Sequence, residues 1–339
     1  MPPSSVLMVA GPSTGGIRRH VLLLRDELRS RGFDVTVASP VGVAEPDVLL
    51  SFRPGALPRD LGALARAAAR ADVVHAHGLK AGWLAVLARA RPLVLTVHNV
   101  VPAGSPLAFL QRALPRFCSH VIATAGDVAR AMGARATTTV IPAARPGVRA
   151  SRPRAEVRSA LGIDPAAPML VCVARLHPQK DLTTFLGVVS KVHEAEEDVR
   201  AVIVGEGPAE RDVRAEIRQR GLGEVVAMAG RRDDAPDVIA AADVLVVSSR
   251  WESGPFVLAE AAELGTPAVS TRVGWAERLL PDELLAPAGD PRALAEAVVT
   301  VLADPDPARF AKESLARASF LDTSPLVDDV VEVYRAVTR

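Results

Sequence analysis

The chain has 339 residues and a net charge of +1; 49% of its residues are hydrophobic and 23% are charged. This length favours two domains, and the apolar content allows each of them to bury a core. An aromatic content of only 4% argues against nucleic-acid or carbohydrate surfaces built from many stacking rings. The two cysteines, Cys118 and Cys172, cannot form a disulfide framework and favour a reducing, cytoplasmic location.

The charge is unevenly distributed along the chain. Residues 1–150 contain 18 Lys or Arg against 8 Asp or Glu, whereas the remainder contains 22 against 31. A basic first half favours an anionic partner, such as a membrane surface or a phosphate-bearing or lipid-linked acceptor. No nucleic-acid recognition motif accompanies the charge, so nucleic acid is not expected. The alternative is a set of scattered, solvated arginines.

No membrane-spanning segment or signal peptide is expected. Val6–Ala10 lacks a basic leader. The longest uncharged run, Pro92–Gln111, contains three prolines, a glycine, His98 and Asn99, which is typical of a strand followed by a loop. We expect a cytoplasmic protein that is soluble or peripheral at the inner face of the membrane.

Short apolar runs alternate with amphipathic stretches, which is typical of βα units around parallel sheets. In the first half the predicted strands are Val6–Ala10, Val35–Ser39, Val48–Phe52, Val73–Ala76, Leu93–Val97 and Val121–Thr124. The helix after the first strand carries Ile17, Val21, Leu24 and Leu28 on one stripe and should end at Gly32.

A proline- and arginine-rich segment, Ile141–Pro153, predicts the domain boundary. We expect a first domain over 1–148 and a second over 149–324. The predicted elements that follow are the strands Met169–Ala174, Ala201–Val204, Val225–Ala229, Val244–Val247, Ala268–Ser270 and Leu284–Ala286, and the helices Leu182–Ala195, Pro291–Ala303 and Pro325–Arg339. The predicted fold is α/β, with two doubly wound, Rossmann-like domains around a cleft, and ligands bind such sheets at the carboxyl ends of their strands.

The first strand runs into a glycine-containing turn, Gly11-Pro-Ser-Thr-Gly15-Gly16, before a helix. Such a turn lets a phosphate approach the backbone and the helix N-terminus. It lacks the spacing of a dinucleotide fingerprint or a P-loop, and a tight turn without a ligand is an equal alternative.

Three histidines end neighbouring strands: His75, His77 and His98. A metal site is one interpretation, but no carboxylate or cysteine joins them at a usable spacing, so we expect no metal. We expect the imidazoles to line a cleft and bind hydroxyls, with His98 in direct contact with the substrate.

Two cations, Arg175 and Lys180, follow the first strand of the second domain. A guanidinium fork and an ammonium group five residues apart in a loop can bind a diphosphate. An ordinary solvated basic loop is the alternative.

The stretch from Ser249 to Glu260 leaves a buried strand and enters a helix near Pro255. Glu252 and Glu260 should lie near one strand end, where a carboxylate pair can hold sugar hydroxyls. Exposed amides at Gly254, Pro255 and Phe256 should contact an anion. Taken alone, Glu260 could only compensate the helix dipole.

Together these motifs resemble family 4 of the retaining glycosyltransferases, which have the GT-B fold. The resemblance covers nearly the whole chain and is most specific in VARLHPQKDL (173–182), VIVGEGP (202–208) and AADVLVVSSRWESGPFVLAEAAELGTPAVSTRVG (241–274). It implies a first, acceptor-side domain, a second domain that binds a nucleotide-sugar donor, and a last helix that returns to the first.

The resemblance also assigns roles to single residues. Arg175 and Lys180 would bind the donor diphosphate, Glu252 the transferred sugar and Glu260 the ribose hydroxyls. The remaining positions would surround the donor: Gly15 and Gly16 near its phosphates, His98 near the sugar, Gly205 beside the nucleotide and Arg231 near the base. The chain departs from the family pattern at Ser253-Gly254 and at Gly274-Trp275.

The implied reaction is metal-independent transfer of a sugar from a UDP- or GDP-linked donor to an acceptor hydroxyl with retention, in cell-envelope glycan, glycolipid or secondary-metabolite synthesis. Arg175, Lys180 and helix N-termini would stabilise the leaving diphosphate. No cofactor is expected besides the donor substrate. The Asp304-Pro-Asp306 sequence imitates a metal-binding motif but lies in a late loop between helices. The alternatives are a nucleotide-sugar 2-epimerase of the same fold and a non-catalytic nucleotide-sugar-binding protein.

Leu107–Phe117 mixes Leu and Phe with Arg112 and Arg116. A membrane-surface helix has this composition. Pro115 and the short length favour a helix packed on the core instead.

Overall fold

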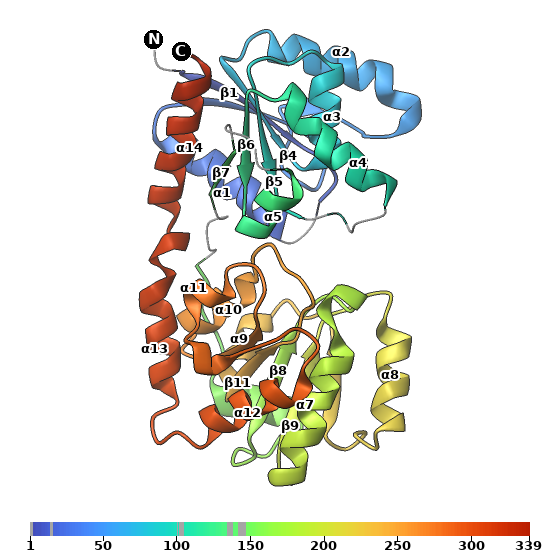
Figure 1. Cartoon of the computed structure of the whole chain (residues 1–339), viewed down its shortest axis with the longest axis vertical. Coiled ribbons are helices and arrows are strands. Elements are labelled where there is room, and N and C mark those ends of the chain that lie inside the picture. Colours follow the sequence, from blue (N-terminus) through green and yellow to red (C-terminus); the bar gives the residue numbers. More distant parts are fainter. Residues whose placement is uncertain (1–2, 14–15, 100, 102–104, 134–137, 142–146) are drawn as a thin grey trace. The chain divides into compact units, whose positions relative to one another are not determined.

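The computed structural model describes residues 3–13, 16–99, 101, 105–133, 138–141 and 147–339. The chain divides into two compact units (Figure 1): unit 1 comprises Met1–Ala144 with Phe320–Arg339, and unit 2 comprises Arg145–Ser319. The predicted boundary after residue 148 lies close to this division. None of the described helices is long and apolar enough to cross a membrane.

Unit 1 contains a seven-stranded parallel sheet in the order β3-β2-β1-β4-β5-β6-β7. Its strands are β1 Ser5–Ala10, β2 Asp34–Ser39, β3 Val48–Leu49, β4 Val73–His77, β5 Leu93–Val97, β6 His120–Ala123 and β7 Thr138–Val140. Its helices are α1 Gly16–Ser30, α2 Leu57–Ala68, α3 Leu79–Leu87, α4 Pro106–Ala113, α5 Gly126–Ala131 and α14 Thr323–Val337, with the short 3-10 turns η1 Pro54–Ala56 and η2 Leu114–Phe117.

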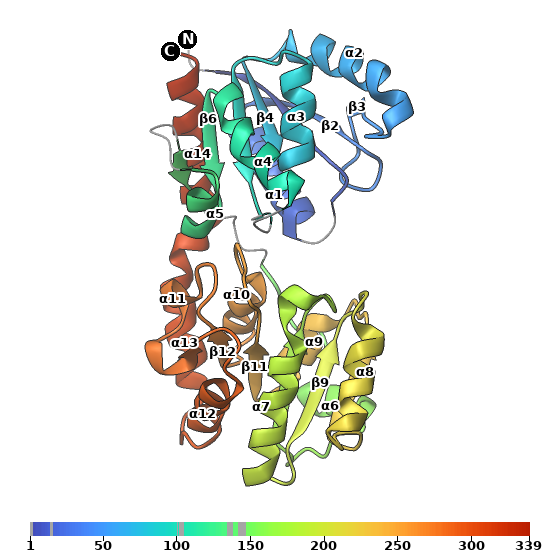
Figure 2. The same cartoon turned by 45° about the vertical axis from the view of Figure 1, so that its right-hand side comes forward.

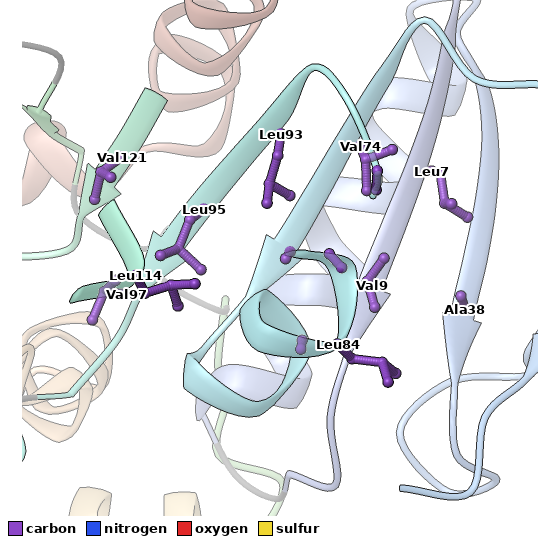
Figure 3. Packing of buried hydrophobic residues seen from close by; sticks show 14 of the residues in the cluster. Leu7, Val9, Ala38, Val74, Leu84, Leu93, Leu95, Val97, Leu114 and Val121 are labelled. Carbon is purple, nitrogen blue, oxygen red and sulfur yellow. The ribbon is translucent and has the colours of Figure 1, made fainter. Parts of the chain in front are cut away.

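Side chains of β1 alternate between two cores because successive residues of a strand point to opposite faces of the sheet. Val6 and Met8 pack with α1 and α14 on one face. Leu7 and Val9 pack on the other face with Leu84 of α3 (Figure 3). Helix α14 therefore belongs to the core of unit 1, although it is the last helix of the chain.

Unit 2 contains a six-stranded parallel sheet in the order β10-β9-β8-β11-β12-β13. Its strands are β8 Met169–Val173, β9 Arg200–Val204, β10 Val226–Gly230, β11 Val244–Val247, β12 Ala268–Thr271 and β13 Leu285–Ala286. Its helices are α6 Arg154–Ala160, α7 Leu182–Ala195, α8 Glu210–Gln219, α9 Ala235–Ala241, α10 Phe256–Glu263, α11 Ala276–Leu279, α12 Pro291–Leu302 and α13 Ala308–Arg317, with η3 Pro178–Lys180 and η4 Asp282–Leu284; η5 Ala318–Leu321 leads out of it.

Each sheet reverses its strand order at one place. In unit 1 the reversal lies between β1 and β4, and in unit 2 between β8 and β11. The loops that leave the carboxyl ends of two such strands diverge to opposite faces of the sheet, and ligands of doubly wound domains bind in the gap. The two switch points are therefore where a site is expected in each unit.

One predicted strand is shorter in the structure, and one observed strand was not predicted. The predicted strand Val48–Phe52 stops at Leu49, because the Asp60 carboxylate accepts the backbone N–H groups of Ser51 and Phe52 at 3.0 and 2.9 Å and turns the chain away. Strand β7 was not predicted, since Thr138–Val140 is too short and too polar for an apolar run to be recognised.

Candidate active site

The unit 2 switch point holds an ion pair between the loops that follow β8 and β11. Lys180 ends η3, and its ammonium group contacts the carboxylate of Glu252. The Glu252 side chain is only 8% exposed, and its Oε1 also accepts a hydrogen bond from Ser249 Oγ at 2.7 Å. A half-buried ammonium group is thereby held at the carboxyl end of the sheet by a carboxylate whose own position is fixed.

Further hydrogen bonds tie these two loops together. The Gln179 side chain donates from Nε2 to the Trp251 backbone carbonyl at 2.9 Å, and the Gln179 backbone carbonyl accepts the Arg250 N–H at 2.8 Å. Ser248 Oγ donates to the Lys180 carbonyl at 2.9 Å. Gln179 and Ser248 were not predicted as part of the site, because their partners lie 72 and 68 residues away in sequence. Ser249 was not predicted either, although its partner Glu252 is only three residues away. These bonds pre-position Lys180 and Glu252.

Arg175 is exposed on the loop after β8, the same loop that carries Lys180. Within the part of the chain that the structure describes, no carboxylate pairs with its guanidinium. A free guanidinium and a paired ammonium group thus follow one strand at the switch point, and together they can bind an anion.

The loop after β11 leads into α10, which Pro255 precedes. Glu260 lies inside this helix and is half-buried. Of the three amides predicted to contact an anion, Pro255 has no N–H and Phe256 donates its N–H to the Gly254 carbonyl at 3.0 Å. That prediction is wrong for these two residues, and only the Gly254 N–H is left for a ligand among the described contacts.

Trp275 packs beneath this loop. A Cβ at Gly254 would stand 2.5 Å from the Trp275 indole nitrogen, and the rings of Phe256 and Trp275 meet edge to face at 5.9 Å. Gly254 therefore permits the close approach of Trp275, which stands at one of the departures from the family pattern.

Gly205 follows β9 with a φ of +142°, and a Cβ there would lie 1.9 Å from the Ala174 carbonyl oxygen. Only glycine allows the β9 loop to approach the loop of Arg175 so closely. Arg231, after β10, lies 3.5 Å from Glu206 in a pair that is 72% and 63% exposed. The predicted residues Gly205 and Arg231 thus follow the carboxyl ends of β9 and β10, the two strands on one side of β8.

The unit 1 switch point holds buried histidines. His75 on β4 contacts the Tyr334 hydroxyl through Nδ1 and the Thr96 hydroxyl through Nε2, both at 2.6 Å. Both of its ring nitrogens are occupied by hydroxyls of the protein, so the prediction that His75 lines a cleft is wrong. The His75 ring lies 4.2 Å from that of His77, which it supports.

His20, His77 and His98 form a second group, with one ring nitrogen each within 4.8 Å of the others. His77 Nδ1 lies 3.4 Å from His98 Nε2, while His20 Nδ1 and His77 Nε2 are buried without a hydrogen-bond partner in the described structure. Burial lowers the pKa of His20 to about 4, and burial together with the neighbouring imidazoles holds the pKa values of His77 and His98 well below their ordinary range. The three imidazoles are therefore neutral at pH 7.

Neutral imidazoles can bind hydroxyl groups or a divalent metal. The contact between His77 and His98 already engages one nitrogen of each ring, and no described carboxylate stands behind the group to orient a metal ligand. His20 was not predicted, although it falls on the apolar stripe of α1, three residues after Ile17, where a polar residue is buried. Gly16 begins α1, and Gly15 lies outside the described residues.

The metal-like sequence at Asp304 lies between α12 and α13. The Asp304 carboxylate pairs with Arg309 at 2.8 Å. This loop does not follow any of the strands that form the two switch points. The Asp304 carboxylate serves in a local ion pair.

Comparison with known proteins gives matches over both units. Residues 14–144 match the family model described as Glycosyltransferase Family 4, and residues 167–304 match that described as Glycosyl transferases group 1. Phosphatidyl-myo-inositol mannosyltransferase of Mycobacterium leprae is 28% identical, over 95% of this chain and 93% of its own. D-inositol 3-phosphate glycosyltransferase of Segniliparus rotundus is 27% identical, over 87% and 72%.

Solved structures match over the same length. HepE of Anabaena, in complex with UDP-glucose, has a TM-score of 0.82 at 23% identity and covers 97% of this chain and 98% of its own. Sucrose-phosphate synthase from Thermosynechococcus elongatus has a TM-score of 0.81 at 21% identity, with 98% of both chains covered. With two parallel-sheet α/β units, these matches confirm the predicted GT-B fold.

Proposed function

We propose that this chain, which belongs to glycosyltransferase family 4, transfers a sugar from a nucleotide diphosphate sugar to an acceptor hydroxyl with retention of configuration. The observation that carries the proposal is the group of charges at the unit 2 switch point. Arg175 is exposed and unpaired among the described residues, and Lys180 is held by Glu252 beside the same strand end.

Breaking the bond between the sugar and the diphosphate leaves negative charge on the leaving oxygens. A guanidinium and an ammonium group fixed before the reaction stabilise this charge without reorganisation. The Gly254 N–H would contact the phosphates, and the loop at Gly205 would lie beside the nucleoside. Arg231, which follows β10, would face the base.

The carboxylates would act on hydroxyl groups. Oε1 of Glu252 is taken by Lys180 and Ser249, whereas Oε2 accepts a long hydrogen bond from Gln179 Nε2 at 3.4 Å. Oε2 would use its remaining lone pair to bind the transferred sugar. Glu260, inside α10, would hold the ribose. In unit 1, His98 would contact the sugar, and the turn at Gly15 and Gly16 would approach the phosphates.

The relatives support particular substrates. The complexes of HepE with UDP and UDP-glucose support a UDP-linked donor, and the mannosyltransferase among the relatives supports mannose as an alternative sugar. The names of the relatives mention inositol 3-phosphate and phosphatidyl-myo-inositol, which supports an acceptor that bears phosphate or lipid. Synthesis of a cell-envelope glycan, a glycolipid or a secondary metabolite fits such an acceptor.

The decisive experiment is a panel of UDP- and GDP-sugars scored first by thermal stabilisation and then by reaction. A donor at 100 times its dissociation constant should stabilise the protein by about 2.7 kcal/mol. NMR of the product, with the acceptor that gives turnover, should find the anomeric configuration of the donor. An epimerised nucleotide sugar formed without acceptor, or binding without any turnover across acceptors, would contradict the proposal.

Metal independence is part of the proposal, because the two cations take the place of a divalent ion. Activity should be unchanged after dialysis against EDTA. If EDTA abolished activity, if added metal restored it in the wild type, and if added metal failed to restore it in a His20→Ala variant, the histidine group of unit 1 would be assigned a metal.

A further inference from the structure

One segment of unit 1 combines exposed apolar side chains with a sequence that contains no carboxylate. From Val73 to Gly126 the sequence contains no Asp or Glu, whereas it contains Lys80, Arg89, Arg91, Arg112 and Arg116. Helices α3 and α4 and the turn η2 all come from this segment, and α3 and α4 lie close together in both views (Figures 1 and 2).

Five large apolar side chains of this segment are exposed. Phe109 is 74% exposed, Leu87 58%, Leu107 52%, and Leu110 and Phe117 39% each. Phe117 lies against Trp83 of α3 at 5.7 Å between ring centroids, which connects η2 to the helix that carries Leu87. The turn η2 thus contacts both α3 and α4, so the elements that carry these five residues are neighbours.

Helix α4 is oriented with its apolar side outward. Its most deeply buried described residue is polar: Gln111 is 3% exposed and is held by the Val101 N–H at 2.9 Å and the Asn99 carbonyl at 2.7 Å. Leu107, Phe109 and Leu110 of the same helix are all exposed. The expectation that the segment Leu107–Phe117 packs on the core is confirmed for Leu114, which is fully buried, and is wrong for Leu107, Phe109 and Leu110.

Four arginines accompany the apolar residues: Arg89, Arg91, Arg112 and Arg116, all exposed. None of them has an ion-pair partner among the described residues; Arg116 donates only to the Arg112 carbonyl, at 3.2 Å. We call these four arginines, with Leu87, Leu107, Phe109, Leu110 and Phe117, the apolar-basic face.

We propose that the apolar-basic face docks on an anionic lipid bilayer. Leucine and phenylalanine enter the boundary between headgroups and acyl chains, while unpaired arginines attract the negative surface. A bilayer offers anionic headgroups around any inserted apolar group, so it can meet arginines distributed over α4, η2 and the loop after α3. This docking would bring unit 1 to the membrane whatever reaction the chain catalyses.

The test is flotation of the full chain with vesicles of phosphatidylcholine alone and of phosphatidylcholine with phosphatidylglycerol. The wild type should float with the anionic vesicles and not with the neutral ones. The triple variant Leu107→Ser/Phe109→Ser/Leu110→Ser should bind the anionic vesicles at least about tenfold more weakly, because each methylene that no longer enters the bilayer costs about 0.8 kcal/mol of binding free energy. The double variant Arg112→Gln/Arg116→Gln should lose roughly fivefold per arginine, from about 1 kcal/mol for each basic residue near the surface.

Matched controls come from the rest of unit 1. Val41→Ser removes an apolar side chain that is 78% exposed, and Arg53→Gln/Arg59→Gln removes two exposed arginines near α2; both should float as the wild type does. Circular dichroism and melting temperature establish that each variant is folded. Equal flotation of the wild type with both vesicles, wild-type flotation of the triple variant, or a dimer in solution that the triple variant dissociates, would overturn the proposal.

Discussion

Units 1 and 2 share a doubly wound parallel sheet, and each gathers polar residues where its strand order reverses, but the two groups differ in charge. Unit 2 holds the exposed Arg175 and the Lys180–Glu252 pair. Unit 1 holds His20, His75, His77 and His98, all buried and neutral. The topology thus determines where a ligand can bind, while the residues at the strand ends determine whether charges or uncharged hydrogen-bonding groups meet it.

The largest expected effect tests the charged switch point. Arg175→Ala and Lys180→Ala should each lower kcat/KM by roughly 100- to 1,000-fold, because each removes a cation that stabilises the leaving diphosphate. Steady-state assays with the donor from the nucleotide-sugar panel measure this effect. Wild-type kcat/KM in Arg175→Ala would show that the leaving group lies elsewhere.

Thermal melting separates the two variants. Arg175→Ala should melt as the wild type does, since its side chain is exposed and unpaired among the described residues. Lys180→Ala should melt at a lower temperature, because it leaves the Glu252 carboxylate, 8% exposed, without its cation. Arg218→Ala, an exposed arginine on α8, is the matched control and should change neither quantity.

A second effect separates the units by their response to acid. Burial lowers the pKa of His20 to about 4 and, with His20 as a neighbouring charge, that of His75 to about 3. An unfolded histidine titrates near 6.5, so the unfolded state binds more protons below this pH and unit 1 loses stability as the pH falls from about 6.5 to 4. In this range each such histidine lowers the free energy of unfolding by about 1.4 kcal/mol for each unit that the pH falls.

Hydrogen exchange at pH 7.5 and pH 5, corrected for the intrinsic rates, measures this effect for peptides of each unit in one experiment. His20→Leu places an apolar residue on the apolar stripe of α1. The variant should lose less stability in unit 1 between pH 7.5 and pH 5 than the wild type does, by the contribution of one histidine. The same pH dependence in wild type and variant would mean that His20 does not remain neutral in the folded protein.

The smallest effect concerns the contact that α14 makes with the histidines. Tyr334→Phe removes the hydroxyl that His75 Nδ1 contacts at 2.6 Å in a fully buried position, which should cost about 1–3 kcal/mol in urea unfolding. Thr338→Ala, which removes local bonds from its hydroxyl to the Tyr334 and Arg335 carbonyls at the end of α14, should change stability by less than about 0.5 kcal/mol. Equal stability of the two variants would mean that the buried hydroxyl contributes nothing.

Elements with long apolar patterns could be predicted from the sequence, and side-chain partners could not. The strand Val244–Val247 and the helix Leu182–Ala195 have the predicted bounds, because buried runs and a clear helical period define them locally. The pairing of Lys180 with Glu252 depends on β8 lying beside β11, which is a property of the sheet order. The partner of His75 is 259 residues away in sequence, beyond the reach of any local pattern.

Motifs were more informative for the family than for geometry. The segments around Arg175 and Glu252 led to the family that the comparisons then found over both units. The same segments did not disclose that the Phe256 amide is used inside its own loop, or that Trp275 packs against Gly254, since both depend on the conformation of a turn rather than on residue type. The roles of Glu252, Glu260 and His98 remain predictions that the kinetic variants can test.

Helix α14 has a consequence for the order in which the protein is made. Unit 1 is assembled from segments before and after unit 2, and Val330, Val331 and Tyr334 complete its core. On the ribosome, the strands of unit 1 emerge first but cannot complete their core before α14 is synthesised, whereas unit 2 is continuous and precedes α14. The first-made unit is therefore the last that can finish folding, and its uncovered apolar surface is the part of a nascent or truncated chain that most needs a chaperone.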